Sequence, residues 1–202
     1  MLRETVKAIV HAIAWIAVTP SVVSWWLRTQ IMGADRALEG STQAWALVPG
    51  LIGQYLRRAF LSRTLRECAR TATIEFGTLF SSTAASIGAR VHIGPRCHLG
   101  WAEIEDGALL AAGVHVPSGA KTHGIDDLTI PMWQQPTVKT PVRIGANAWI
   151  GSAAVVMADV GRDSVIAAGA VVTRPIPDLS IAGGVPARVF RHRNPRLEER
   201  SA

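Results

Sequence analysis

The sequence predicts a mainly β protein, in which a parallel β-helix follows an α-helical segment and carries one excursion loop. The β-helix is predicted because an aliphatic residue returns about every six positions over residues 87–172, usually followed by a small residue. Such hexapeptide periods are typical of parallel β-helices. The loop is predicted because the period stops between Val116 and Ile144.

The N-terminal segment, residues 1–70, is predicted to be helical. Residues 8–27 contain no Asp, Glu, Lys or Arg and are rich in Ala, Val, Ile and Trp. This length would span a bilayer, but Pro20 and several polar residues interrupt it, and Trp residues suit an interface. We expect an apolar helix, broken near Pro20, that lies on or dips into a bilayer. Packing on the solenoid end or on a partner subunit, and a true span, remain alternatives.

A second helix is predicted after Pro49 and Gly50, where apolar residues recur at helical spacing between residues 51 and 60. Its opposite face is expected to carry four arginines, Arg57, Arg58, Arg63 and Arg66. Because a basic amphipathic helix is typical of membrane surfaces, residues 1–66 are predicted to contact one.

Residues 71–190 are predicted to form the β-helix. Each hexapeptide supplies a short strand and a corner: the aliphatic residue points inward, and the small residue lets the chain turn tightly. The coils stack and share one core. The period is short between Leu99 and Ile104 and between Val156 and Ile166, so tightened coils are expected there. The clearest repeats are 87–92, 93–98, 144–149, 150–155 and 166–171.

The predicted loop, residues 117–141, contains residue types that do not suit a β-helix wall. They are His123, Asp126, Asp127, Trp133 and the prolines Pro131, Pro136 and Pro141. Insertions on a rigid repeat scaffold are where binding and chemistry concentrate, so we expect the functional site here. Residues 191–202 are predicted to form a basic C-terminal tail.

Composition narrows the function classes. A hydrophobic content of 49% excludes a disordered protein. The 21 Lys and Arg exceed the 15 Asp and Glu, and the net charge of +6 favours an anionic partner. No zinc-finger spacing, RNA-binding strand motif or recognition helix is found, so no nucleic-acid partner is expected. Cys68 and Cys97 form no CxxC unit and are not expected to pair, which fits a reducing cytosol.

Three segments stand out beyond the repeat itself: IGANAWIG at 144–151, IAAGAVVTRPIP at 166–177 and AGGVPAR at 182–188. With the repeats and the loop, they resemble the hexapeptide-repeat acyltransferases over about residues 73–193. The similarity is closest to the branch of galactoside, maltose and antibiotic O-acetyltransferases. The N-terminal helices, together with residues 118–119 and 123–127, look like those of bacterial polysaccharide-biosynthesis O-acetyltransferases.

This resemblance implies a left-handed β-helix and a homotrimer. It also implies active sites in grooves between neighbouring solenoids, where coenzyme A lies along the groove and the acceptor hydroxyl reaches a loop histidine. Trp149 would then lie near the reactive end of coenzyme A. Gly151, Ala168 and Gly169 would contact the donor, and Thr173, Arg174 and Arg188 would lie near its nucleotide end. Corner geometry for the small residues and a solvated surface role for the arginines are the alternatives.

Acyl transfer from a thioester to a hydroxyl needs a base, donors for the oxyanion and aligned substrates, but no metal. His123 is the predicted base, because an imidazole titrates near neutral pH. Asp126 or Asp127 would orient the ring or, with Trp133, contact the acceptor. Backbone N–H groups around Gly151 or Ser152 are the candidate oxyanion donors.

Lys121 departs from the pattern of the polysaccharide branch. Those relatives commonly have two histidines separated by one residue, and Lys121 occupies the place of the first. Either the loop is shifted so that His123 is the base, or the usual chemistry is lost or altered. In the second case His123 has a role only in binding and not as the base, or it is an ordinary loop histidine.

His98 and His115 are seventeen residues apart, which is one coil after the short repeat, so we expect them to stack on one face. His92 belongs to another face. A metal site would need a third ligand beside His98 and His115. We therefore predict that these two imidazoles lie at the surface or at an interface, and that they bind no metal.

The predicted function is a coenzyme A-dependent O-acyltransferase that transfers an acetyl group from acetyl-CoA to a sugar hydroxyl. We expect a role in polysaccharide or lipid-linked glycan biosynthesis, in the cytoplasm and peripheral at the inner face of the membrane. The alternative is a non-catalytic hexapeptide solenoid that acts as a scaffold or nucleotide-binding module.

Overall fold

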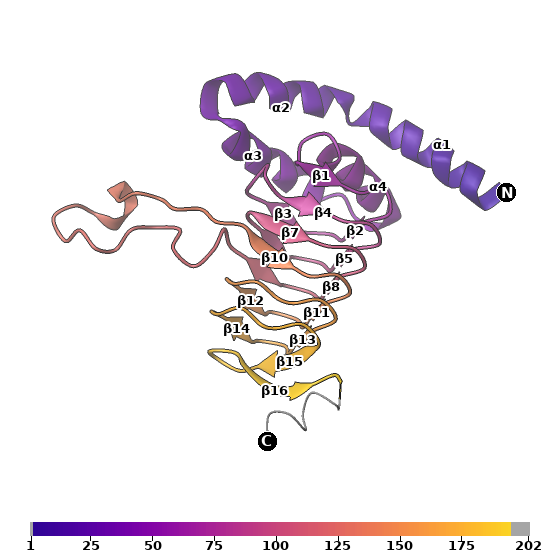
Figure 1. The fold of residues 1–202 in the computed structure, drawn as a ribbon. Coiled ribbons are helices and arrows are strands. Elements are labelled where there is room, and N and C mark those ends of the chain that lie inside the picture. The colour runs from indigo at the N-terminus through magenta and orange to yellow at the C-terminus, as the bar shows by residue number, and fades with distance from the viewer. Residues whose placement is uncertain (1, 195–202) are drawn as a thin grey trace.

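A helical cap sits on one end of a three-sided β-solenoid (Figure 1). This computed structural model describes the backbone of residues 2–194 and the side chains of residues 5–194. The solenoid has about six turns and is of the left-handed β-helix type, so the predicted fold class is confirmed. The helices of the cap are α1 (Leu2–Ala17), α2 (Thr19–Met32), α3 (Ala34–Ala46) and α4 (Gly50–Leu61).

The solenoid has three faces, and each face is one sheet. Every strand pair is parallel except that of β15 and β16, which is antiparallel. Face A contains β1 (Glu67–Cys68), β4 (Ser86–Ile87), β7 (Ala102–Ile104) and β10 (Val142–Ile144). Face B contains β2 (Thr73–Ile74), β5 (His92–Ile93), β8 (Leu109–Leu110), β11 (Trp149–Ile150), β13 (Val165–Ile166), β15 (Ser180–Gly183) and β16 (Arg188–His192). Face C contains β3 (Leu79–Phe80), β6 (His98–Leu99), β9 (His115–Val116), β12 (Val155–Val156) and β14 (Val171–Val172).

The core is a column filled by one inward residue from nearly every short strand. On face B, for example, Ile74, Ile93, Leu110 and Ile150 are stacked in register and fully buried. The predicted tightening is present on face A, where Val160 forms isolated bridges to both neighbouring coils instead of a full strand. Because no coil buries its apolar side alone, the coils are stable only as a stack.

The small residue after each aliphatic position has a different role from the predicted one. Gly151 does not have a positive φ. Instead, a Cβ added to it would lie 2.5 Å from the backbone nitrogen of Ala168 in the next coil. The left-handed conformation occurs two residues later, at Ala153, with φ 57°. Close stacking of the coils, rather than the turn, therefore requires the small side chain.

The cap is layered on the N-terminal end of the solenoid. Helix α3 packs on β3 and α4 packs on β1 and β2, while α1 contacts α4 and α2 contacts α3. The predicted break is present: α1 and α2 are separated at Val18 and bent by 42°, and Pro20 lies in the first turn of α2. Among the described residues, no helix alone is long and apolar enough to cross a bilayer, whereas these two together have the required length and composition.

The predicted orientation of α4 is wrong at Arg57. Arg57 is only 2% exposed, and Leu51 and Ile52 are largely exposed. The guanidinium donates hydrogen bonds to the carbonyls of Ile74, Trp45 and Val48. The Arg57 side chain lies at the junction of α3, α4 and the first coil. Buried backbone carbonyls at this junction need hydrogen-bond donors, and the long Arg57 side chain reaches three of them.

The loop 117–141 leaves after β9 and returns at β10, so it projects from the corner between faces C and A (Figure 1). It contains one 3₁₀ turn, Met132–Gln134. The predicted tail begins too early, because strand β16 pairs with the last coil and includes Arg191 and His192. Residues 195–202 of the predicted tail lie outside the described residues. Cys68 and Cys97 are free and buried, and burial raises their thiol pKa values to about 12 and about 11.

Candidate active site

The base of the loop is held at the corner of the solenoid and at the cap. Thr140 donates a backbone hydrogen bond to the carbonyl of Ser118, with an N–O distance of 3.0 Å. Lys139 Nζ lies 3.1 Å from Asp35 Oδ2 on α3, and Asp35 Oδ1 accepts hydrogen bonds from Thr83. The position where the loop leaves the solenoid is therefore defined by contacts on both sides.

The outer part of the loop closes on itself around Gln135, which is 6% exposed. Its Nε2 donates to the carbonyl of Asp127 at 2.8 Å, and its Oε1 accepts from the Asp127 backbone nitrogen at 3.3 Å. Gly124 donates to the carbonyl of Pro136 at 3.0 Å. These contacts place His123 at the narrow neck between the base of the loop and its outer part.

His123 is exposed and forms no hydrogen bond or ion pair with any described residue. Asp127 Oδ1 instead accepts hydrogen bonds from the backbone and hydroxyl of Thr129, which hold the pKa of its carboxyl below the usual value. Asp126 and Trp133 are also exposed. No carboxylate therefore orients the imidazole in this arrangement, and the role of His123 as base stays a prediction.

Of the residues predicted to bind the donor, Trp149, Gly151, Ala168 and Gly169 form a strip along one edge of the solenoid. Trp149 points outward from face B and is half exposed. Gly151 and Ser152 follow it at the corner between faces B and C. Ala168 and Gly169 occupy the same corner one coil further, where the Gly169 N–H donates to the Ser152 carbonyl at 2.8 Å.

Hydrogen bonding within this strip narrows the choice of oxyanion donor. The Gly151 N–H donates to the Ile166 carbonyl at 2.8 Å and so belongs to the ladder between coils. The Ser152 N–H has no partner among the described residues. Of the two predicted donors, only Ser152 has a backbone N–H that a ligand can use.

The base and the donor strip do not come together within one chain. Thr173 and Arg174 follow β14 and lie at the corner between faces C and A, which is also the corner from which the His123 loop leaves. The donor strip around Trp149 lies on face B and at its corner with face C. Arg188 begins β16 beyond the last parallel coil and is exposed. The predicted site residues are thus divided between two corners.

The expected stacking of His98 and His115 is confirmed. Their rings lie on face C with centroids 5.0 Å apart and planes inclined by 17°. Burial lowers the pKa of His115, and His98 lowers it further. In the described part of the chain, no group of three or more His, Cys, Asp or Glu side chains is placed to hold a metal ion.

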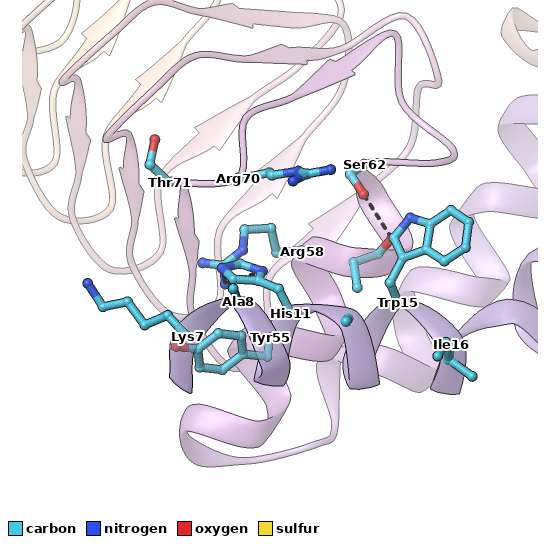
Figure 2. Close-up of a pocket in the computed structure, with 12 residues that line it drawn as sticks. Lys7, Ala8, His11, Trp15, Ile16, Tyr55, Arg58, Ser62, Arg70 and Thr71 are labelled. Atoms are coloured by element: carbon cyan, nitrogen blue, oxygen red, sulfur yellow. Dashed lines mark hydrogen bonds between the residues drawn. The ribbon is translucent and has the colours of Figure 1, made fainter. Parts of the chain in front are cut away.

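Sequence reasoning missed a cavity between α1, α4 and the first coil (Figure 2). Its lining includes Lys7, His11, Arg58 and Arg70. The spacing of Lys7 and His11 was a usable signal for a shared helix face, but their contact with Arg58 and Arg70 depends on how the helices pack.

A model of the hexapeptide repeat of succinyl-transferase matches residues 84–117 and 141–174. The two matched stretches lie on either side of the loop, which the repeat does not include. The resemblance to hexapeptide-repeat acyltransferases is thereby confirmed for the solenoid itself.

Two curated relatives match parts of the chain. A protein named as a probable acetyltransferase of Mycobacterium tuberculosis is 39% identical over 102 residues, which are 50% of this chain and 33% of the relative. Galactoside O-acetyltransferase of Escherichia coli is 50% identical over 58 residues, which are 28% of this chain and 29% of the relative. The chain thus spans about a third of the length of these relatives.

Among solved structures, galactoside acetyltransferase in complex with coenzyme A superposes with a TM-score of 0.56. The sequence identity is 23%, and the superposition covers 83% of this chain and 86% of the other. At this identity the likeness establishes the fold.

Proposed function

We propose, from the confirmed resemblance to the hexapeptide-repeat acyltransferases, that this chain transfers an acetyl group from acetyl-CoA to a sugar hydroxyl. The observation that carries the proposal is the His123 loop, which is held at a defined corner of a regular solenoid whose repeats match on both sides of it. Both curated relatives are named acetyltransferases, and one acts on galactosides by its name. A role in polysaccharide or lipid-linked glycan synthesis is part of this proposal.

In the proposed reaction His123 takes the proton of the acceptor hydroxyl while the oxygen attacks the thioester carbonyl carbon. The tetrahedral oxyanion accepts a hydrogen bond from the free Ser152 N–H. Collapse of the intermediate breaks the C–S bond, and the imidazolium returns its proton to the coenzyme A thiolate. The products are the acetyl ester and coenzyme A.

The assignment of His123 is tested by the release of coenzyme A thiol from acetyl-CoA in the presence of candidate glycans. His123→Ala is expected to lower the rate at least about a hundredfold, because it removes the base. His92→Ala is the matched control, since His92 points outward on face B away from the loop. Undiminished activity of His123→Ala would overturn the assignment.

A homotrimer is proposed because one chain separates the two halves of the site. Trp149 lies on face B, whereas the His123 loop leaves from the corner between faces C and A. A neighbouring solenoid placed in a cyclic trimer would bring the loop of one chain to the donor strip of the next. Light scattering of the purified protein measures the mass of the assembly directly.

Mixed trimers test whether the site is shared between chains. His123→Ala and Trp149→Ala are each expected to be inactive, and mixing them after reversible dissociation is expected to restore about a quarter of the sites, because each site then draws its two residues from different chains. A mixture that stays inactive, although mixed trimers have formed, would place both residues in the same site of one chain and contradict the proposal.

Contact with a membrane surface through residues 1–66 is a further part of the proposal. Among the described residues, α1 buries only Ala14 and α2 buries none, while Val18 between them is buried. Many large apolar side chains on both helices remain exposed. Because the donor is a cytoplasmic metabolite, the proposed location is the inner face of the membrane. Liposome flotation with and without residues 1–32 tests it, and equal flotation of the two forms would refute it.

A non-catalytic solenoid is the second candidate, favoured by Lys121 and by the fact that no described carboxylate forms a hydrogen bond or ion pair with His123. It predicts no measurable affinity for coenzyme A. Calorimetric titration with coenzyme A separates the two candidates, since micromolar binding agrees with the enzyme and contradicts a pure scaffold.

A further inference from the structure

The cavity between α1, α4 and the first coil has a volume of about 820 Å³ (Figure 2). Helix α1 and the loop project on opposite sides of the solenoid (Figure 1). Lys7, His11 and Trp15 are spaced four residues apart, so they line the cavity from one face of α1. Arg58 lines it from α4, and Arg70 lines it from the turn between β1 and β2. Its volume is in the range of small-molecule sites.

The lining of this cavity is cationic. Lys7, Arg58 and Arg70 contribute three positive charges, and no Asp or Glu lines the cavity within the described part of the chain. The pKa of His11 lies below its usual value because of burial and because Arg58, Arg70 and Lys7 repel its proton, in that order. The field at the His11 ring is therefore positive, and an anion in the cavity would relieve this repulsion.

Arg58 is held in place with part of its hydrogen-bonding capacity unused. Its Nη1 donates to the carbonyl of Ala72 at 2.8 Å, its Nη2 lies 3.1 Å from His11 Nε2, and its guanidinium lies 4.8 Å from the centre of the Tyr55 ring. Its Nε is buried and has no partner. A fixed guanidinium beside further cations is a favourable arrangement for phosphate oxygens.

One side of the cavity is apolar and continues to the surface. Ala12, Trp15 and Ile16 line it, and Ile9 and Ile13 are exposed on the same helix, as is Ile16. A free inorganic anion would fill only a small part of this space and would not use the apolar side. An amphipathic helix of this kind lies at the headgroup level of a bilayer when it binds one.

We propose that this cavity binds the phosphate headgroup of a membrane lipid. Arg58, Arg70 and Lys7 contact the phosphate oxygens, and the hydrocarbon chains leave along the apolar side of α1 beside Ile16. This site rests on the membrane contact proposed for residues 1–66, but not on acyl transfer, because it is separate from the donor strip and the His123 loop. Its effect would be to fix the orientation of the solenoid relative to the bilayer.

Flotation of the full chain with three kinds of vesicle tests the proposal. The vesicles are phosphatidylcholine alone, phosphatidylcholine with phosphatidic acid, and phosphatidylcholine with enough oleate to match the surface charge of the second kind. Binding is expected to be strongest with phosphatidic acid. Lys7→Gln combined with Arg70→Gln is expected to weaken that binding at least about tenfold, because two phosphate-facing cations are lost.

The matched control is Arg90→Gln combined with Arg96→Gln, which removes the same charge from two exposed solenoid residues outside both the cavity and residues 1–66, and is expected to cost less than about twofold. Unchanged thermal unfolding midpoints show that both double variants are folded. Equal binding to oleate vesicles, or equal loss in the control, would show that surface charge alone acts and would overturn the proposal. Competition by inorganic phosphate as strong as that by short-chain phosphatidic acid would identify a free anion instead and would also overturn it.

Discussion

At the scale of single residues, Arg57 shows how a charged side chain can be a structural core element. It is 2% exposed, and burial lowers its pKa. Its cost of desolvation is offset by hydrogen bonds to three backbone carbonyls from α3, the turn after it and β2. Helical periodicity indicates which residues share a face, but it does not indicate which face meets the solenoid.

Replacing Arg57 by Met tests this role, because Met keeps much of the apolar length and removes every donor. We expect the free energy of unfolding to fall by about 3 kcal/mol, since buried carbonyls lose their partners. Arg66→Met is the control: Arg66 is half exposed and forms an ion pair with Glu103 at 2.8 Å, so its loss should cost less than about 1 kcal/mol. Urea denaturation measures both, and equal losses would contradict the structural role.

Two glycines on neighbouring coils distinguish crowding from backbone strain. A Cβ on Gly151 would lie 2.5 Å from the Ala168 nitrogen, whereas a Cβ on Gly169 would meet nothing within 4 Å. Gly169 has a φ of +67°, which disfavours alanine by about 1 kcal/mol. Gly151→Ala is therefore expected to destabilise the fold more, by about 2–3 kcal/mol. Denaturation midpoints that rank the two variants in the opposite order would show that the coils can separate locally.

At the scale of elements, face C contains a pair of imidazoles that makes stability depend on pH. Because the pKa of His115 is lowered in the folded chain, its imidazole binds a proton less readily there than in the unfolded chain. The free energy of unfolding therefore falls as the pH drops below the usual value of 6.5 towards the lowered pKa.

Replacing His115 by Gln is expected to make the free energy of unfolding less dependent on pH in this window. His98→Gln removes only the second cause, the nearby His98, and should have a smaller effect. Chemical denaturation at several pH values between neutral and mildly acidic measures the slopes. An unchanged slope in His115→Gln would show that this pair does not control acid sensitivity.

The strands and the loop were predictable because the period of six is a local property of the sequence. Inward residues such as Ile93 and Ile150 recur at that period, and the loop begins where it stops. The face on which a residue lies is harder to predict, because it depends on the length of every preceding corner. The positions of His123 and Trp149 on different sides of the solenoid therefore emerge only from the assembled coils.

The cavity beside α1 illustrates the same limit for contacts between distant segments. Arg58 and His11 are 47 residues apart in sequence, and nothing local in either helix indicates that they meet. Their contact results from the packing of α1 on α4. The sequence predicts the charge and the apolar face of each helix, whereas the site depends on the angle at which the two helices cross.

At the scale of the whole molecule, the four helices have two separate roles. Helices α3 and α4 cover the first coil and bury Leu38, Arg57 and Phe60, so they act as the terminal cap that a solenoid requires. Helices α1 and α2 form the outer layer of the cap and contact mainly the other helices. In the described part of α2 no residue is buried.

Two truncations test this division. Removal of residues 1–32 is expected to leave a soluble solenoid with a small decrease in thermal midpoint, because the core loses only two buried residues, Ala14 and Val18, and the partly buried Val22 and Trp25. Removal of residues 1–61 is expected to cause aggregation, since it uncovers the apolar end of the column at Ile74 and Phe80 and the unpaired edges of the first strands. Soluble yield and light scattering measure both outcomes. If the longer truncation gives a soluble product that unfolds cooperatively, the solenoid is stable without its cap. All four helices would then be needed only for contacts with other molecules.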